Sequence, residues 1–332
     1  MTDGTTRPVR AGRRTVELHR PDKVLFPGDD GGDDGGGDGS GGGATEYTKA
    51  DLVDHYRSVA PFMLPQLRGR PLMLERYPDG LDGPRFMQKN TPDHYPDWIE
   101  RATVAKEGGT VTHVVCGDTA TLVYLADQAC VTLHRWLSRA TRPDRPDRLV
   151  LDLDPPGDDF AAVRQAAGWA GDLLDRLGLP SAPMTTGSRG VHLVVPLNGG
   201  HPFDEVRAFA HDLAELLVAE HPDRLTTAVR KDDRGDRLFL DMGRNAYAQT
   251  AVAPYTVRAR PGAPVAVPIS WDQLADPDVD ARRWTIADAA DQARTRPWAG
   301  LSGRGRALGP ARRRLDALRK GVVRPHKVSG RM

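Results

Sequence analysis

Several features that define common classes of protein are missing from this 332-residue chain. Its two cysteines, Cys116 and Cys130, are too few for a disulfide framework or a four-cysteine zinc site, so we expect both to be reduced. No run of about 18 apolar residues is present, which excludes a transmembrane helix. The polar, arginine-rich N-terminus also lacks the apolar segment of a secretory signal. We therefore expect a cytoplasmic protein that has no membrane partner.

The chain also lacks an excess of charge of either sign, because its net charge at pH 7 is only +1. Any contact with nucleic acid must therefore come from local clusters of Lys and Arg. One such cluster is the segment 296–332, in which residues 301–332 carry ten Lys or Arg and a single acid, Asp316. A tail of this kind either binds nucleic acid electrostatically or is a solvated, disordered end, and it favours a helix over residues 311–320.

A second segment of biased composition, residues 28–46, consists almost entirely of Gly and Asp. It has too few apolar groups to offset the entropy lost on ordering, so we predict a disordered insertion. A calcium-binding repeat is the alternative, which the irregular spacing disfavours. The predicted organisation is a flexible N-terminal arm over residues 1–14, one domain over 15–295 interrupted by this insertion, and the basic tail over 296–332.

Between these segments the apolar residues alternate between helical and strand periodicity. Helical spacing predicts helices over residues 50–64, from Asp158 or Asp159 to Leu177, and over 203–220. Aliphatic runs predict strands over residues 148–153, 191–197 and 237–242. Strands separated by helices indicate an α/β or α+β sheet domain.

Two acids lie in the first of these predicted strands, in the segment Leu-Val-Leu-Asp152-Leu-Asp154-Pro-Pro. Alternate side chains of a strand share one face, so both carboxylates point the same way while the leucines point into the core. Adjacent carboxylates repel unless a cation lies between them, and such a pair is suited to a divalent metal ion. A solvated pair of acids at a strand end is the alternative explanation.

A third acid, Asp241, follows the apolar run Leu238–Leu240. A buried carboxylate is costly unless it is paired or bound to a metal ion. Three carboxylates can hold two metal ions about 4 Å apart, the geometry that activates a hydroxyl and stabilises a leaving pyrophosphate. The alternative is ion pairing of Asp241 with Arg234, Arg237 or Arg244.

A turn rich in Gly, Ser and Thr, residues 185–190, leads into the next predicted strand. Its glycines allow backbone amides to approach an anion, and Arg189 and the hydroxyls of Thr186 and Ser188 are further donors. The turn is therefore a candidate triphosphate site. In the segment 132–136, strand alternation places His134 opposite the apolar Val131 and Leu133, where it could contact a phosphate or serve a structural role.

At these residues the chain resembles the archaeo-eukaryotic primase superfamily, and specifically the polymerase domain of bacterial ligase D. The resemblance covers about residues 15–295 and implies an α+β, primase-like fold whose mostly antiparallel or mixed sheet is flanked by helices. Its motifs occur in the family's order: Pro21–Pro27, Tyr47–Lys49, Arg76–Gly80, Phe86–Lys89, Leu133-His134, Asp152–Pro155, Gly187–His192, Asp241–Asn245 and Ala253–Arg258.

The resemblance implies a two-metal nucleotidyltransferase that adds nucleotides to DNA 3′ ends, fills gaps and processes ends in non-homologous end joining. Implied cofactors are two Mn²⁺ or Mg²⁺ ions, with an NTP or dNTP substrate and some preference for ribonucleotides. Implied partners are broken or gapped DNA with 5′-phosphates, Ku and a separate ATP-dependent ligase, at the nucleoid. The implied metal ligands and catalytic residues are Asp152, Asp154 and Asp241, and the implied nucleotide contacts are His134, Thr186, Ser188, Arg189, His192, Arg234 and Arg258.

Five further residues are implied DNA or 5′-phosphate contacts: Lys23, Lys49, Arg76, Phe86 and Lys89. The chain departs from the family where Met87 replaces a second aromatic residue and where Thr186 replaces a serine. The Gly/Asp insertion separates Lys23 from Lys49, and its negative charge would repel DNA if it covered the phosphate pocket. No Lys-x-Asp-Gly ligase motif is present, so we expect a stand-alone polymerase. A de novo primase and a non-catalytic DNA-end-binding module are the alternatives.

Overall fold

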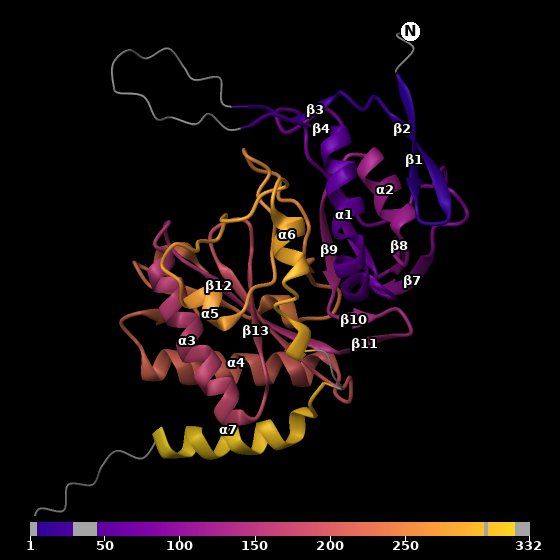
Figure 1. The fold of residues 1–332 in the computed structure, drawn as a ribbon. Coiled ribbons are helices and arrows are strands. Elements are labelled where there is room, and N and C mark those ends of the chain that lie inside the picture. Colours follow the sequence, from indigo (N-terminus) through magenta and orange to yellow (C-terminus); the bar gives the residue numbers. More distant parts are fainter. Residues whose placement is uncertain (1–4, 29–44, 302–304, 323–332) are drawn as a thin grey trace, which may run out of the picture.

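The computed structural model describes residues 5–28, 45–301 and 305–322, and arranges their strands in two main sheets with helices packed around each (Figure 1). The predicted Gly/Asp insertion lies almost wholly outside these residues. The first sheet is antiparallel except for one parallel pair, β15 with β16, which confirms the expected mixed, mostly antiparallel sheet. In spatial order its strands are β13 (Ala182–Thr185), β14 (Val191–Pro196), β12 (Arg148–Asp154), β16 (Leu238–Asp241) and β15 (Leu225–Thr226).

The second sheet is antiparallel throughout and carries one wall of the central pocket. Helices α1 (Lys49–Leu67) and α2 (Thr119–Asp127) pack beside it (Figure 1). The observed α1 contains the predicted helix 50–64; it begins at the capping box of Thr48 and Asp51 and continues through Pro61 and Pro65. In spatial order the strands are β17 (Thr250–Val252), β9 (Cys130–Trp136), β5 (Leu72–Arg76) and β6 (Phe86–Gln88).

Helices α3 (Phe160–Leu177) and α4 (Phe203–Glu220) pack with the first sheet, and both were predicted from their apolar periodicity. The Asp159 carboxylate caps α3 by accepting hydrogen bonds from two backbone amides, and Gly178 ends it in the left-handed conformation. The remaining elements are β3 (Val24–Phe26), β4 (Tyr47–Thr48), β7 (Arg101–Lys106), β8 (Gly109–Val114), β10 (Ser138–Arg139), β11 (Arg142–Pro146), α5 (Trp271–Ala275), α6 (Ala289–Arg294) and the 3₁₀ turns Lys231–Asp233, Gly243–Asn245 and Ala299–Leu301.

Residues 5–14 do not belong to a flexible arm of the kind predicted over residues 1–14. Strand β1 (Thr6–Ala11) pairs in antiparallel register with β2 (Arg14–His19). Val9 and Ala11 are buried with Val16 and Leu18, so one face of this hairpin belongs to the main core. The alternation of these small apolar residues outweighs the intervening charges, and the ordered domain begins before residue 15.

The C-terminal segment also differs from the expected tail. The predicted helix over 311–320 is confirmed as part of α7 (Leu308–Val322), but its apolar face is buried through Leu308, Ala311 and Leu315. Arg312 and Arg319 both form ion pairs with Asp212 of α4. Over these residues the segment is therefore a packed helix, because apolar positions at helical spacing lie among its arginines. None of the helices in the described part of the chain has the length and apolar character needed to span a bilayer.

A buried histidine makes the stability of the fold sensitive to acid. Nε2 of His55 lies 3.0 Å from the Tyr255 carbonyl oxygen, to which it donates a hydrogen bond, and burial lowers the His55 pKa to about 4. The folded pKa is below the ordinary value of 6.5, so the unfolded chain takes up the proton first. The stabilising contribution is therefore present above pH 6.5 and is lost as the pH falls towards 4.

We expect the free energy of unfolding of the wild type to fall by about 2 kcal/mol from this group between pH 7 and pH 5. His55→Gln retains a hydrogen-bond donor but does not titrate, so its urea-unfolding free energy should depend less on pH by this amount. The exposed His94→Gln is the matched control and should keep the wild-type dependence. Equal pH dependence in wild type and His55→Gln would contradict the assignment.

Candidate active site

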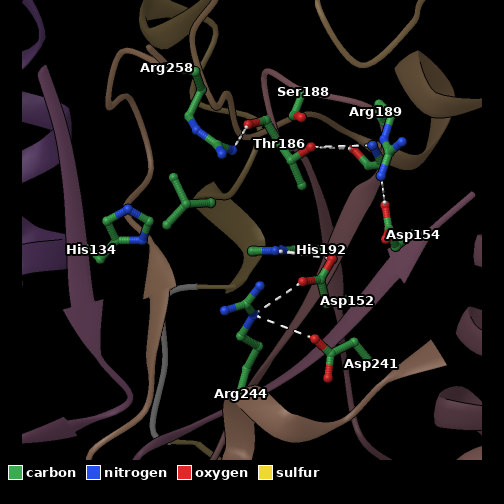
Figure 2. Close-up of a pocket in the computed structure, with 12 residues that line it drawn as sticks. His134, Asp152, Asp154, Thr186, Ser188, Arg189, His192, Asp241, Arg244 and Arg258 are labelled. Atoms are coloured by element: carbon green, nitrogen blue, oxygen red, sulfur yellow. Dashed lines mark hydrogen bonds and ion pairs between the residues drawn. The ribbon is translucent and has the colours of Figure 1, made fainter. Parts of the chain in front are cut away.

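A polar pocket of about 170 Å³ lies between the first sheet and strand β9 of the second (Figure 2). Three of its walls come from segments that the sequence singled out: the acids of β12, the end of β16 and the turn before β14. The lining residues are His134, Asp152, Asp154, Thr186, Ser188, Arg189, Gly190, His192, Asp241, Arg244, Val252 and Arg258.

The three predicted acids converge in this pocket (Figure 2). Strands β12 and β16 are antiparallel neighbours, and Asp152 is the direct register partner of Asp241. Asp154 follows two residues later on β12, so strand alternation places it on the same face as Asp152. Acids 89 residues apart in sequence (241 minus 152) are thus adjacent in space, as the sequence analysis required.

Arginines balance the charge of these carboxylates in the structure. Nε of Arg244 lies 3.2 Å from Asp152 and 3.8 Å from Asp241, while Arg189 donates a hydrogen bond of 3.3 Å to Asp154 (Figure 2). Arg244 was expected only as a possible ion-pair partner of Asp241 and was not among the predicted site residues. Its position three residues after Asp241, within a one-turn 3₁₀ helix, is the signal that could have identified it.

Asp152 is held in its charged form. Burial by itself would raise its pKa, but His192, whose Nε2 lies 3.4 Å from the carboxylate, and Arg244 together lower the pKa of Asp152 to about 2. His192 was expected to contact the nucleotide; in the structure it is buried on β14 and its polar contact is with Asp152. Asp152 is therefore an ionised carboxylate, suited to binding a cation at neutral pH.

The donor set of the pocket fits a hard divalent cation. All three acids offer carboxylate oxygens, the ligands that Mg²⁺ and Mn²⁺ prefer. Among the described residues, no three acidic, histidine or cysteine side chains are close enough to hold an ion as they stand. Arg244 supplies the compensating charge instead, and its side chain is 42% exposed.

The turn between β13 and β14 forms the wall opposite the acids. Gly190 is required by a close backbone approach, because a Cβ there would lie 2.0 Å from the Leu153 carbonyl oxygen. The hydroxyl of Thr186 is bonded within the turn, to the backbone of Gly190, and Arg258 donates to the Thr186 carbonyl at 2.5 Å. Arg282, which the sequence analysis missed, donates to the Ser188 carbonyl at 2.8 Å and holds the outer side of the turn.

His134 enters the pocket from β9 and is oriented by Glu75 of β5, a third residue that was not predicted from the sequence. Their side chains lie 3.4 Å apart. Burial by itself would raise the Glu75 pKa, but hydrogen bonds from His134 and Tyr77 lower it to about 2. Glu75 is therefore an anion that fixes the imidazole ring. Its signal in the sequence was the position directly before the Arg76-Tyr77-Pro78 motif.

Arg234 is the predicted nucleotide contact that does not line the pocket. Its guanidinium donates to the carbonyls of Ala228 and Val229 and lies over the Phe239 ring, at 3.7 Å from the centroid. One of its nitrogens lies 4.0 Å from Asp154. Arg234 therefore lies next to Asp154 but outside the pocket lining, and it contributes positive charge to the site.

A second, basic pocket lies at the N-terminus of α1 and contains two of the predicted phosphate contacts, Lys49 and Arg76, together with His19 and Arg20. Lys49 is buried, and its ammonium lies 3.6 Å from the carboxylate of Asp127. Burial lowers the Lys49 pKa, and Asp127 opposes that shift. The predicted partner Lys23 does not line this pocket, because its ammonium pairs with Asp79 at 3.0 Å.

The two remaining predicted DNA contacts lie on or directly after the edge strand β6. Phe86 is 50% exposed, as is typical of a ring that awaits a stacking partner, and the neighbouring Met87 is also exposed. Lys89 is exposed and follows the strand. These side chains form a surface outside the acidic pocket.

The fold and this pocket define a class of enzyme. A mixed sheet with two acids on one strand and a third on its neighbour, facing a glycine turn and several arginines, is the site of a primase-polymerase type nucleotidyltransferase. The family model described as the LigD primase-polymerase domain matches residues 48–298. The chain belongs to this family.

Known proteins resemble the chain over most of its length. The multifunctional non-homologous end joining DNA repair protein LigD of Mycobacterium tuberculosis is 34% identical over 276 residues, covering 80% of this chain and 34% of that protein. The bifunctional non-homologous end joining protein LigD of Bacillus subtilis is 33% identical over 229 residues, covering 68% and 37%. The chain therefore spans about a third of the length of these relatives.

A solved structure shares the fold. The polymerase domain from Mycobacterium tuberculosis ligase D in complex with DNA superposes with a TM-score of 0.69 at 32% identity, covering 75% of this chain and 89% of that one. This similarity confirms the expected α+β, primase-like fold.

Proposed function

We propose that this protein adds ribonucleotides or deoxyribonucleotides to DNA 3′ ends, filling gaps and processing ends during repair of double-strand breaks by non-homologous end joining. The single observation that carries the proposal is the convergence of Asp152, Asp154 and Asp241 opposite an arginine-lined turn. Membership of the LigD primase-polymerase family and the names of the relatives support the same reading.

In this proposal the three carboxylates hold two divalent ions, Mn²⁺ or Mg²⁺. Such ions, when bound, lower the pKa of the primer 3′-hydroxyl and neutralise charge on the triphosphate. Asp241 is the residue we assign to the primer side. Arg189 and Arg258, from the opposite wall, neutralise the phosphate oxygens as the 3′-hydroxyl attacks the α-phosphorus and pyrophosphate leaves.

The remaining groups of the pocket position the nucleotide. His134, fixed by Glu75, and the hydroxyl of Ser188 are placed to contact the sugar or phosphates. Thr186 shapes the turn through its bond to Gly190 and also lines the pocket. Contact of a hydroxyl with a 2′-OH would favour ribonucleotides.

We propose that the physiological substrate is broken or gapped DNA with a 5′-phosphate, at the nucleoid, supplied by a Ku-like end binder and sealed by a separate ATP-dependent ligase. The DNA-bound structural relative supports the DNA substrate. The test is a gap-filling assay with phosphorylated and unphosphorylated downstream strands, in parallel with ATP-type and deoxy substrates. Primer extension supports the proposal, and synthesis on unprimed template would indicate a primase instead. DNA binding without any extension would indicate a non-catalytic module.

Lys49 should determine the preference for a 5′-phosphate. In Lys49→Gln the pocket at the start of α1 loses its buried cation, so affinity for phosphorylated gapped DNA should fall by about tenfold. Affinity for the unphosphorylated substrate should hardly change. Fluorescence anisotropy with the two substrates measures this ratio.

Lys89→Gln is the matched control, since it removes the same charge from the β6 surface and should weaken binding to both substrates alike. Because Lys49→Gln removes the ammonium beside the buried Asp127 and leaves His19 as its one ion-pair neighbour among the described residues, the melting temperature must be measured as well. Arg76→Gln removes a second cation of the pocket but leaves the ion pair of Lys49 with Asp127 in place. Like Lys49→Gln, it should reduce the preference for phosphorylated DNA. An unchanged preference in both pocket variants would refute this assignment.

A further inference from the structure

The N-terminal β1–β2 hairpin, with its flanking residues Thr5 and Arg20, is strongly basic. We call residues 5–20 the basic hairpin; it carries five arginines and a single acid, Glu17. This charge stands out in a chain whose net charge is +1. The basic hairpin also lies outside the segment matched by the family model, which begins at residue 48. Neither the core nor the proposed catalytic site requires such a concentration of arginine.

The arginines divide into two groups by their contacts. Arg7 lies 4.0 Å from Asp54 and Arg14 lies over the Trp98 ring, at 4.9 Å from its centroid, so both attach the hairpin to the body of the protein. Arg10, Arg13 and Arg20 are exposed, and among the described residues no carboxylate lies within ion-pair distance of them. These three charges are available to an external anion.

The hairpin is joined directly to the basic pocket at the start of α1. The buried carboxylate of Asp127 accepts a hydrogen bond of 2.8 Å from the His19 backbone amide, and the His19 ring lies 3.0 Å from its other oxygen. The same carboxylate pairs with Lys49. His19 and Arg20 therefore line the pocket while the hairpin leads away from it beside α1 and α2 (Figure 1).

The separation of these charges matches a nucleic-acid duplex. Residues 19 and 13 are six positions apart, so a strand rise of about 3.3 Å per residue places Arg13 roughly 20 Å from the pocket. Double-stranded DNA covers that distance in about six base pairs, at 3.4 Å per phosphate along each strand. Arg10 lies between the two, on the outward face opposite the buried Val9 and Ala11.

We propose that the basic hairpin binds the phosphate backbone of the duplex downstream of the gap, with Arg10 and Arg13 as its principal contacts. This inference rests on the proposed function, because it takes the pocket of Lys49 as the place where the downstream strand begins. A duplex that starts there and runs along the hairpin would meet Arg20 first and Arg13 last. The contact is electrostatic and independent of sequence.

The experiment compares a long substrate, gapped DNA that has a 16-base-pair downstream duplex, with a short substrate, the same primer and template without the downstream strand. In the double variant Arg10→Gln/Arg13→Gln, affinity for the long substrate should fall about fivefold at low salt, and the salt slope should decrease by about 1.8. The short substrate should bind as in the wild type. The loss should be the same with and without a 5′-phosphate, which separates the hairpin from the Lys49 pocket.

Two further variants complete the test. Arg313→Gln/Lys320→Gln removes the same two charges from the exposed face of α7 and should bind both substrates like the wild type. Glu17→Gln removes the single acid of the hairpin and should tighten binding of the long substrate, a gain that unfolding cannot produce. Equal affinities of the wild type and the hairpin double variant for the long substrate would overturn the inference while leaving primer extension intact. Failure of the wild type to bind or extend gapped DNA would overturn the proposed function as well.

Discussion

Asp241→Asn should reduce nucleotide addition by about 10³-fold or more while leaving DNA affinity within about twofold of the wild type. The amide keeps the size of the carboxylate and an oxygen to accept the hydrogen bond of 2.7 Å from the Gly243 backbone amide. It removes the negative charge that faces Asp152 across the strand pair. Single-turnover primer extension with saturating Mn²⁺ measures the effect.

Asp241 is a cleaner position for this test than Asp152. Asp152 contacts both His192 and Arg244, so its removal would leave a buried histidine without its partner. Asp236→Asn, an exposed acid close by in the sequence, is the matched control and should extend primers at the wild-type rate. Extension by Asp241→Asn at more than a tenth of the wild-type rate would exclude Asp241 from the catalytic set.

Gly190→Ala should destabilise the protein by about 3 kcal/mol and abolish activity. The added Cβ would meet the Leu153 carbonyl oxygen at 2.0 Å, and that atom belongs to the strand that carries Asp152 and Asp154. The backbone of β12 or of the turn must therefore move, and either movement separates the acids from Arg189. Urea unfolding measures the stability, and primer extension measures the damage to the site.

Gly168→Ala is the matched control for this substitution. Gly168 lies in the middle of α3, and a Cβ there would meet nothing within 4 Å. The same chemical change should therefore stabilise the protein by up to about 1 kcal/mol, because alanine is the better helix former. Two glycine substitutions with equal effects on stability would contradict the close approach at Gly190.

The acidic half of the site could be predicted because it follows from strand periodicity. Alternation places Asp152 and Asp154 on one face, and an apolar run ending at Asp241 marks a neighbouring strand. What the sequence could not give was the pairing register that sets Asp241 directly opposite Asp152. Register depends on contacts between distant segments, and here the resemblance to a known family supplied the missing link.

The groups that tune the site were harder to predict, because each acts through a partner remote in sequence. Glu75 reaches His134 only because β5 and β9 are neighbours, and Arg282 reaches the Ser188 carbonyl from the connection between α5 and α6. The predictions for the two ends of the domain were wrong for a local reason, the composition of each segment. Charge dominated the composition of the hairpin and of α7, although a few small apolar residues at the correct period, such as Val9 and Leu315, sufficed to bury one face.

The most direct measurement follows primer length and pyrophosphate release on DNA that has a one-nucleotide gap and a 5′-phosphate. It is made first with Mn²⁺ and then after addition of EDTA. We predict that the wild-type protein lengthens the primer by one residue and releases one pyrophosphate per nucleotide added, and that EDTA stops both. A protein that binds this DNA tightly but releases no pyrophosphate with any nucleotide or divalent ion would contradict the assignment of the three carboxylates.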